Sequence, residues 1–361
     1  MKSASLLPAL SRVVDIEMQE GDALLLGGGF EDRAMWVVRA ATSLRGAKVV
    51  VLDYRPKEKR NRLKEILSAA TKLGASTPGQ GKIVFDRYAP SAFASSLSSF
   101  LTNTPTSRAV IDISAMPKLA FMIALEVCRQ LNLRVCVLYA EAQEYGPLQA
   151  EYEQAKAQSL LHQPSIRLYT GVQGVVRVDL LSSVAMQGHP SAALAFMSMN
   201  EQLTQALINS VCPSRLFLIN GVPPVLSWRE EATAWIHERL REEWPKQDNP
   251  VDDKRLPIRR CSTLDYRESF RMVLDLYWSL CTTHRVIQSP TGSKMQALGC
   301  YFARAVQSDI HVEYPTPRGF LDLYSTGIGP GWTVSFPPLG VFVDKLRSLE
   351  KLDHLGIGPT T

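Results

Sequence analysis

The chain alternates between short apolar runs and longer stretches in which apolar residues recur at helical spacing. Runs such as Ala23–Leu26, Lys48–Asp53 and Arg108–Ile113 are typical of strands that are buried on both faces. Between such runs, stretches such as Lys118–Gln130 place their apolar residues on one side of a helix. This order predicts an α/β protein with mainly parallel sheets covered by helices.

The alternation falls into two series, and the 361 residues are enough for two domains. We predict two tandem Rossmann-like lobes, the first over residues 1–150 and the second over 214–361. Residues 151–213 are expected to form a mainly helical connector.

Three local patterns add detail to this division. The uncharged run Leu180–Asn200 is interrupted by glycine and proline and favours a helix–turn–helix. Ser227 followed by Glu230 predicts a capping box at the start of a helix over residues 227–244. Trp332–Phe336 is expected to be an edge strand of the second lobe.

The two series also share a sequence pattern. A shift of 176 residues places Val110 on Val286 and Lys118 on Lys294, and both lysines directly follow a strand–turn pattern. With one deletion, Tyr139 falls on Tyr314. This recurrence predicts an internal duplication; the alternative is that any two strand–helix–strand segments look alike.

Candidate chemistry is expected at the carboxyl ends of the strands, where open α/β sheets bind their ligands. The turns there are Gly27–Arg33, Asp112–Lys118 and Ser289–Lys294. Their small residues, hydroxyls and lysines suit a phosphate near a helix N-terminus. The predicted ligand-binding residues are Arg33, Ser114, Lys118, Tyr139, Thr291, Gly292, Ser293, Lys294 and Tyr314.

The first turn resembles the beginning of a dinucleotide-binding fingerprint, and Asp53 stands where a ribose-binding acid is expected. Asp32 takes the place of the third glycine, and an acid there repels a pyrophosphate. We therefore expect no cofactor. Glu31 and Arg33 either line the cleft or form a pair on the surface.

Other residues leave two interpretations open. Asp112 is the best candidate for an acid or base, or else it caps the following helix. Tyr139 and Tyr314 either stack on a base or close the core. The basic cluster Lys57–Lys64 forms either a solvated helix face or a surface for phosphate or nucleic acid.

Composition narrows the class of protein. The net charge of +5 permits an anionic partner without requiring nucleic acid. The six cysteines show no metal-ligand spacing, so no metal is expected and a reducing compartment is favoured. No export signal or membrane-spanning stretch is apparent, which predicts a cytoplasmic protein.

The segment Val286–Met295 resembles the strand–turn–helix motif of CRISPR-associated Rossmann fold (CARF) sensors. The matching residues are Thr291, Gly292, Ser293, Lys294 and Met295, and the second glycine of the family motif has no counterpart. The resemblance implies a cyclic oligonucleotide as ligand, a setting in bacterial anti-phage defence and a separate effector protein as partner.

Together these features predict a sensor or adaptor that binds a nucleotide-type anionic ligand in a cleft between two lobes. The alternative is a nucleotide or sugar-phosphate hydrolase or transferase, in which Asp112 acts as base and Lys118 or Lys294 stabilises phosphate charge. A third possibility is a structural protein that only binds partners.

Overall fold

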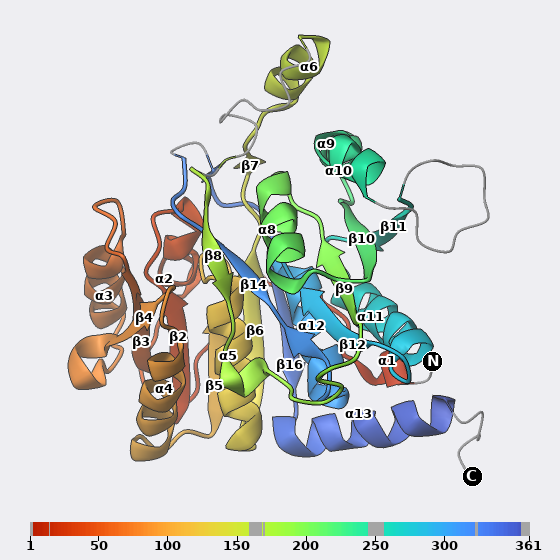
Figure 1. The fold of residues 1–361 in the computed structure, drawn as a ribbon. Coiled ribbons are helices and arrows are strands. Elements are labelled where there is room, and N and C mark those ends of the chain that lie inside the picture. The colour runs from red at the N-terminus through yellow and green to blue at the C-terminus, as the bar shows by residue number, and fades with distance from the viewer. Residues whose placement is uncertain are drawn as a thin grey trace. The chain divides into compact units, whose positions relative to one another are not determined.

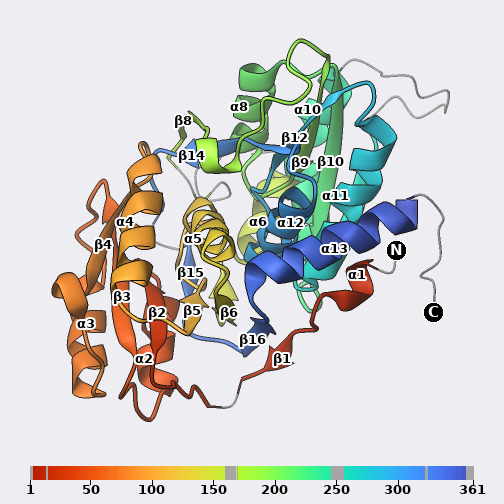
Figure 2. The ribbon, with the colours of Figure 1, turned by 90° about the horizontal axis from the view of Figure 1, so that it is seen from below.

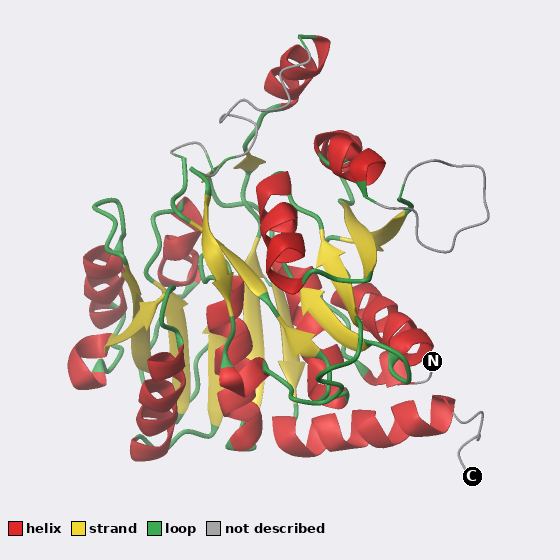
Figure 3. Ribbon diagram, in the orientation of Figure 1, coloured by secondary structure: helices red, strands yellow, loops and turns green. Residues whose placement is uncertain are grey.

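The structure is a computed structural model that describes residues 3–13, 15–158, 168, 170–244, 256–321 and 324–354. The chain forms two compact units. Unit 1 contains Met1–Tyr145 and Ser325–Thr361, and unit 2 contains Gly146–Tyr324. Each unit has its own sheet with flanking helices (Figure 3), which confirms the predicted α/β class.

Unit 1 is built on a seven-stranded sheet in the order β1-β16-β6-β5-β2-β3-β4 (Figure 1). The strands are β1 (Ser11–Arg12), β2 (Asp22–Gly27), β3 (Lys48–Arg55), β4 (Lys82–Asp86), β5 (Arg108–Asp112), β6 (Arg134–Ala140) and β16 (Gly331–Phe336). The strands from β2 to β6 are parallel to their neighbours, whereas β16 runs antiparallel to both β6 and β1. A separate pair, β7 (Glu144–Tyr145) with β15 (Ser325–Thr326), is antiparallel.

Helices cover both faces of this sheet (Figure 2). The helical segments of unit 1 are α1 (Ser3–Leu6), η1 (Asp32–Met35), α2 (Trp36–Ala40), α3 (Leu63–Lys72), η2 (Pro78–Gly81), α4 (Ser91–Asn103), α5 (Lys118–Gln130) and α13 (Leu339–His354). On one face, α2 and α3 bury apolar side chains against the strands, including Val37 and Ile66. On the other, α5 packs against α4 and α13.

Unit 2 is built on a five-stranded parallel sheet in the order β11-β10-β9-β12-β13. Its strands are β9 (Ser191–Phe196), β10 (Arg215–Val222), β11 (Ile258–Ser262), β12 (Arg285–Ser289) and β13 (His311–Val312), and β8 (Val172–Val176) pairs with β14 (Tyr314–Pro317) outside this sheet. The helical segments are α6 (Gln149–Ala157), η3 (Asp179–Leu181), α8 (Glu201–Val211), α9 (Trp228–Ile236), α10 (Glu238–Glu243), α11 (Tyr266–Leu280) and α12 (Lys294–Val306).

The parallel strands follow one topology in both units. In each, the first strand lies at the centre, the second and third lie to one side, and the fourth and fifth lie to the other. The segment β5–α5 therefore occupies the same place as β12–α12, and the two helices begin at Lys118 and Lys294 as predicted. This shared topology agrees with the pattern that suggested a duplication, which stays a prediction.

The structure corrects the interpretation of residues 180–200. Ser191–Phe196 forms β9, the central strand of unit 2, instead of part of a helix–turn–helix in a connector. Its residues include three alanines, which favour helices intrinsically. Burial between two neighbouring strands overrides that preference, because small side chains fit where both faces of the sheet are covered.

The structure also places the C-terminal segment differently from the predicted boundaries. Trp332–Phe336 lies within β16, which belongs to unit 1 and pairs with both β6 and β1. It is therefore neither in the second lobe nor at a sheet edge. Residues that follow unit 2 in sequence complete the sheet of unit 1, an arrangement that strand patterning alone does not reveal.

The helix expected over residues 227–244 is divided at His237 into α9 and α10. The predicted capping box at Ser227 is wrong, because Ser227 has helical backbone angles (φ −56°, ψ −33°) and its side chain makes no capping hydrogen bond. A capping residue needs extended backbone angles.

His237 itself is completely buried, with Nε2 3.0 Å from Thr204 Oγ1 and Nδ1 2.9 Å from the Thr233 carbonyl oxygen. Burial lowers the pKa of His237 to about 4, with a smaller contribution from Arg241. The folded protein thus keeps this imidazole neutral, whereas the unfolded chain protonates it near pH 6.5.

We predict that the free energy of unfolding is highest above pH 6.5 and falls as the pH approaches 4, with His237 contributing a loss of about 3 kcal/mol. Urea unfolding followed by tryptophan fluorescence measures this dependence. His237→Gln should flatten it across that window. An equal slope in the variant and the natural protein would contradict the assignment.

Candidate functional site

The strand order of the sheet in unit 1 reverses between β2 and β5. The chain adds β3 on one side of β2, and it later adds β5 and β6 on the other side. Ligands of open α/β sheets bind at the carboxyl side of this switch point. The loops after β2 and β5 meet there: a Cβ on Gly27 would lie 2.6 Å from Tyr54 Oη and 3.0 Å from the Ala115 carbonyl carbon. Only glycine permits this close approach.

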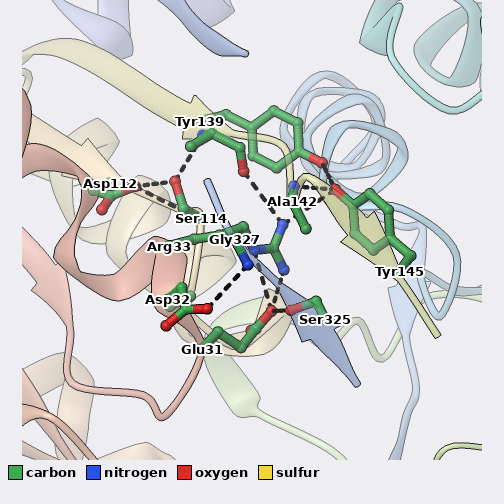
Figure 4. A network of polar contacts seen from close by, with 12 residues as sticks. Glu31, Asp32, Arg33, Asp112, Ser114, Tyr139, Ala142, Tyr145, Ser325 and Gly327 are labelled. Atoms are coloured by element: carbon green, nitrogen blue, oxygen red, sulfur yellow. Dashed lines mark hydrogen bonds and ion pairs between the residues drawn. The ribbon is translucent and has the colours of Figure 1, made fainter. Parts of the chain in front are cut away.

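A buried ion pair follows the glycines (Figure 4). The guanidinium of Arg33 pairs with the carboxylate of Glu31, and the side chains are only 3% and 10% exposed. Burial is the largest single effect and opposes the charged form of Arg33, but Glu31, Tyr145 and Tyr139 together outweigh it and raise the pKa of Arg33. The alternative of a pair on the surface is therefore wrong.

This pair also binds two distant segments of unit 1. Arg33 donates to Tyr145 Oη and to the Ala140 carbonyl oxygen, both at 3.3 Å. Ser325 Oγ donates to Glu31 Oε2 at 2.6 Å. Tyr145 and Ser325 are paired residues of β7 and β15, so the loop after β2 holds both strands of this ribbon.

Asp32, which replaces the third glycine of a dinucleotide fingerprint, is neutralised in the structure. Its carboxylate accepts from Arg62 at 2.7 Å and from the Gly327 amide at 3.0 Å. The Arg62 side chain also donates to the Phe30 carbonyl oxygen at 3.3 Å. The repulsion that Asp32 would exert on an anion is thus largely compensated.

Asp112 and Ser114 form the base of the loop after β5. Asp112 Oδ1 accepts from the Ser114 amide at 2.9 Å and from the Ser114 hydroxyl, which in turn accepts from the Ala140 amide at 2.8 Å. Asp112 therefore shapes the loop and does not cap α5, whose N-cap residue is Pro117. The alternative of a helix cap is wrong.

Lys118 is the first residue of α5 and is partly buried. Its N-cap residue, Pro117, forms no side-chain capping hydrogen bond. Burial lowers the pKa of Lys118 to about 8; Arg33 lowers it further and Glu31 acts in the opposite direction. Lys118 thus combines a lowered pKa with a position at the N-terminus of a thirteen-residue helix, beside the polar loop Asp112–Ser114.

Tyr139 lies on β6 and is 7% exposed, with its hydroxyl 3.3 Å from that of Tyr145. Tyr54 donates to the Ala115 carbonyl oxygen at 3.1 Å. Burial raises the pKa of both Tyr139 and Tyr54 well above the usual value. Both phenols thus remain protonated and act as donors or packing groups.

The basic cluster lies next to this site. The segment Arg55–Lys64 holds six basic residues and one acidic residue. Arg62 binds the glycine-rich loop, and Arg60 lies over the Phe30 ring at 4.3 Å. Lys57, Lys59 and Lys64 are exposed, and only Lys64 lies in a helix, α3. The expected solvated helix face is therefore mostly a loop beside the carboxyl edge.

The remaining predicted residues lie in unit 2, at the turn before α12. Thr291 donates to the Phe196 carbonyl oxygen, and Ser293 donates to that of Thr263 at 2.7 Å. Ser293 and Gln296 form a capping box, and the Gln296 side chain lies against Gly292. The hydroxyls of this turn thus already stabilise the fold.

Lys294 begins α12 and is partly buried, as Lys118 is in unit 1. Tyr314 begins β14, which pairs with β8, whereas its predicted counterpart Tyr139 lies inside the main sheet of unit 1. Burial raises the pKa of Tyr314. The contacts of a ligand with these unit 2 residues stay a prediction.

The structure thus brings five predicted residues together in unit 1: Arg33, Asp112, Ser114, Lys118 and Tyr139. Sequence reasoning missed the contributions of Tyr54, Arg62, Ser325 and Gly327. Arg62 belongs to the predicted basic cluster, but its contact with Asp32 was not predicted, and Tyr54 was not among the candidates. Ser325 is separated from Glu31 by 294 positions and carried no signal.

No known family model matches the chain, and no curated protein is similar to it. Within the described ranges, no group of three or more histidine, cysteine, aspartate or glutamate side chains could hold a metal ion. Nor does any helix in the part of the chain that the structure describes have the length and apolar character needed to span a membrane.

We predict that Arg33→Met lowers the free energy of unfolding by about 3 to 5 kcal/mol, because it leaves the Glu31 carboxylate buried without its cation. The double variant Arg33→Met with Glu31→Gln should be more stable than the single variant. Chemical denaturation measures all three proteins.

A surface pair provides the matched control. Arg347 and Asp344 have side chains that are 33% and 67% exposed. Arg347→Gln should change stability by less than about 1 kcal/mol. An equally small effect of Arg33→Met would show that the buried pair does not hold the loop.

Proposed function

We propose that unit 1 binds a nucleotide-type anionic ligand at the switch point of its sheet, and that the protein acts as a sensor or adaptor. The observation that carries the proposal is Lys118, a partly buried cation at the N-terminus of α5, beside the loop Asp112–Ser114. Helix amides and a lysine charge together favour a phosphate group.

The surrounding charges support the same ligand class. The exposed lysines Lys57, Lys59 and Lys64 give the carboxyl edge near β3 a positive rim. Asp32, the acid that would oppose an anion, is neutralised by Arg62. The rim therefore attracts an approaching anion, and Arg62 offsets the repulsion that Asp32 would otherwise exert.

The resemblance of Val286–Met295 to the CARF motif adds cyclic oligonucleotides to the candidate ligands and bacterial anti-phage defence to the candidate roles. It also suggests a separate effector as partner. In a sensor without a reaction of its own, ligand binding to unit 1 would be read out by that partner.

A second candidate is a nucleotide or sugar-phosphate hydrolase or transferase. The observation that favours it is the pKa of Lys118, which burial lowers to about 8, close to the range in which a side chain exchanges protons efficiently. Product formation that Asp112→Asn abolishes would support this candidate over the sensor.

We predict that Lys118→Ala weakens nucleotide binding about tenfold to a hundredfold, because one charge-assisted contact is lost. Calorimetry against cyclic and linear nucleotides measures this effect. Lys294→Ala, the equivalent change at the start of α12, is the matched control and should bind normally. No binding to any nucleotide would contradict the proposal, and a loss only in Lys294→Ala would move the site to unit 2.

Binding should also depend on pH in a way set by Lys118. Lysine is charged below its pKa, so affinity for an anion should be constant at neutral pH and fall about tenfold per pH unit above about 8. Lys118→Arg keeps its charge throughout and should remove the fall. A fall of the same size in both proteins would assign it to another group.

A further inference from the structure

A different set of polar groups gathers at the carboxyl end of the sheet in unit 2. Four neighbouring strands, β10, β9, β12 and β13, each lead to one buried polar side chain. These side chains belong to Asn220, Asn200, Ser289 and Glu313, and each residue is at most 2% exposed. Among the described residues, Asn220 Oδ1, Asn200 Nδ2, Ser289 Oγ and Glu313 Oε2 find no hydrogen-bond partner.

The strand register places these groups on one face of the sheet. Ser289 is paired with Ala195, which packs against α8, and Leu218 is also paired with Ala195. Asn220 lies two residues beyond Leu218 and so points to the same side. Asn200 is the N-cap residue of α8 on this face.

Glu313 extends the row on β13. It lies two residues beyond His311, whose strand partner Ile287 is itself paired with Ala193 of the α8 face. The Glu313 amide donates to the Gln288 carbonyl oxygen at 3.1 Å, which places Glu313 beside Ser289. Neighbouring strands are about 4.8 Å apart, so adjacent groups lie within reach of one small ligand.

The other polar atoms of three of these side chains are firmly held. Asn220 Nδ2 donates to the Glu230 carbonyl oxygen at 2.8 Å, and Asn200 Oδ1 accepts from the Gln202 amide at 3.0 Å. Glu313 Oε1 is 2.6 Å from Arg177 Nε and 3.1 Å from His311 Nε2. Each side chain is thus fixed while one of its atoms stays unbonded.

A buried polar atom without a partner costs about 1–3 kcal/mol, and native proteins keep few of them. Four at one end of one sheet, where sheets of this topology bind ligands, indicate a partner outside the chain. We propose that this end of unit 2 binds a neutral, hydroxyl-rich ligand, either a free sugar or the sugar of a nucleoside.

The chemistry of the four atoms selects this class. Asn220 Oδ1 and Glu313 Oε2 accept hydrogen bonds, Asn200 Nδ2 donates, and Ser289 Oγ does both. Hydroxyl groups match such a mixed set because each can donate and accept. None of the four atoms belongs to a cation and two of them only accept hydrogen bonds, so they match a phosphate poorly, and this site differs in chemistry from that of unit 1. Arg177, which pairs with Glu313, has a side chain that is 57% exposed.

The test uses the full-length protein with ribose, glucose, adenosine and uridine at millimolar concentration, and binding is measured by ligand-observed NMR. We expect at least one probe to bind. Binding of ribose or glucose would identify a free sugar as the ligand, and binding of adenosine or uridine alone would identify the sugar of a nucleoside. Ser289→Ala and Asn200→Asp should each weaken binding about tenfold. Asn200→Asp retains an oxygen that caps α8 and replaces the unpaired donor by an acceptor.

Stability separates this site from a purely structural role. Ser289→Ala should leave the melting temperature of the unliganded protein unchanged or raise it, because it removes an unsatisfied hydroxyl. The control Ser269→Ala removes a buried hydroxyl that donates to the Tyr266 carbonyl oxygen at 2.9 Å, so it should lower the melting temperature and leave binding intact.

Two results would overturn the proposal: failure of every probe to bind, or binding that Ser289→Ala and Asn200→Asp leave unchanged. Lys118→Ala should not affect these neutral probes. The outcome is therefore independent of nucleotide binding in unit 1.

Discussion

The ion pair between Glu31 and Arg33 fixes the loop on which the rest of unit 1 depends. A guanidinium that is 3% exposed requires a counter-ion and hydrogen-bond acceptors, and the chain supplies them from three separate segments. Two of the contacts, with Tyr145 and Ser325, hold the strands β7 and β15 at which the chain leaves unit 1 and returns to it. The Glu31–Arg33 pair thus joins the glycine-rich loop to β15, where the chain re-enters unit 1 before β16 completes the sheet.

The two switch points differ in chemistry although their strand order is alike. In unit 1 charged side chains surround the site, and the N-cap residue of α5, Pro117, forms no side-chain capping hydrogen bond. In unit 2 the turn before α12 satisfies its own hydroxyls through carbonyl oxygens and a capping box. Its unsatisfied groups lie instead on the α8 face, where Ser289 and Glu313 are neighbours. The two units thus share a topology but differ in the ligand that we propose for each, an anion in unit 1 and a hydroxyl-rich molecule in unit 2.

Local pattern was sufficient for much of the fold. The limits of α5 and α12 agree with the sequence expectation because an apolar period and a clear start, Pro117 or Ser293, define each helix. The parallel strands β2 to β6 of unit 1 were predictable from their short apolar runs. The alanine-rich β9 was not, because its strand conformation comes from its neighbours in the sheet and opposes its intrinsic preference.

The candidate site was predictable only in part. Asp112 ends β5, and Arg33 and Lys118 lie at the ends of the turns after β2 and β5, so their placement at the sheet edge could be inferred. Their partners could not. The contact of Ser325 with Glu31 joins residues 294 positions apart, and it forms because unit 2 is inserted between β7 and β15. No local pattern encodes a contact of this kind.

The central claim is that an anionic nucleotide-type ligand binds at the switch point of unit 1. Hydrogen–deuterium exchange with and without a bound nucleotide tests it most directly, because it locates the ligand along the chain. Ligand binding at this point should slow exchange in residues 113–121, which contain the loop after β5 and the first turn of α5. Unchanged exchange in this segment, with protection only at residues 290–297 or at no site, would contradict it.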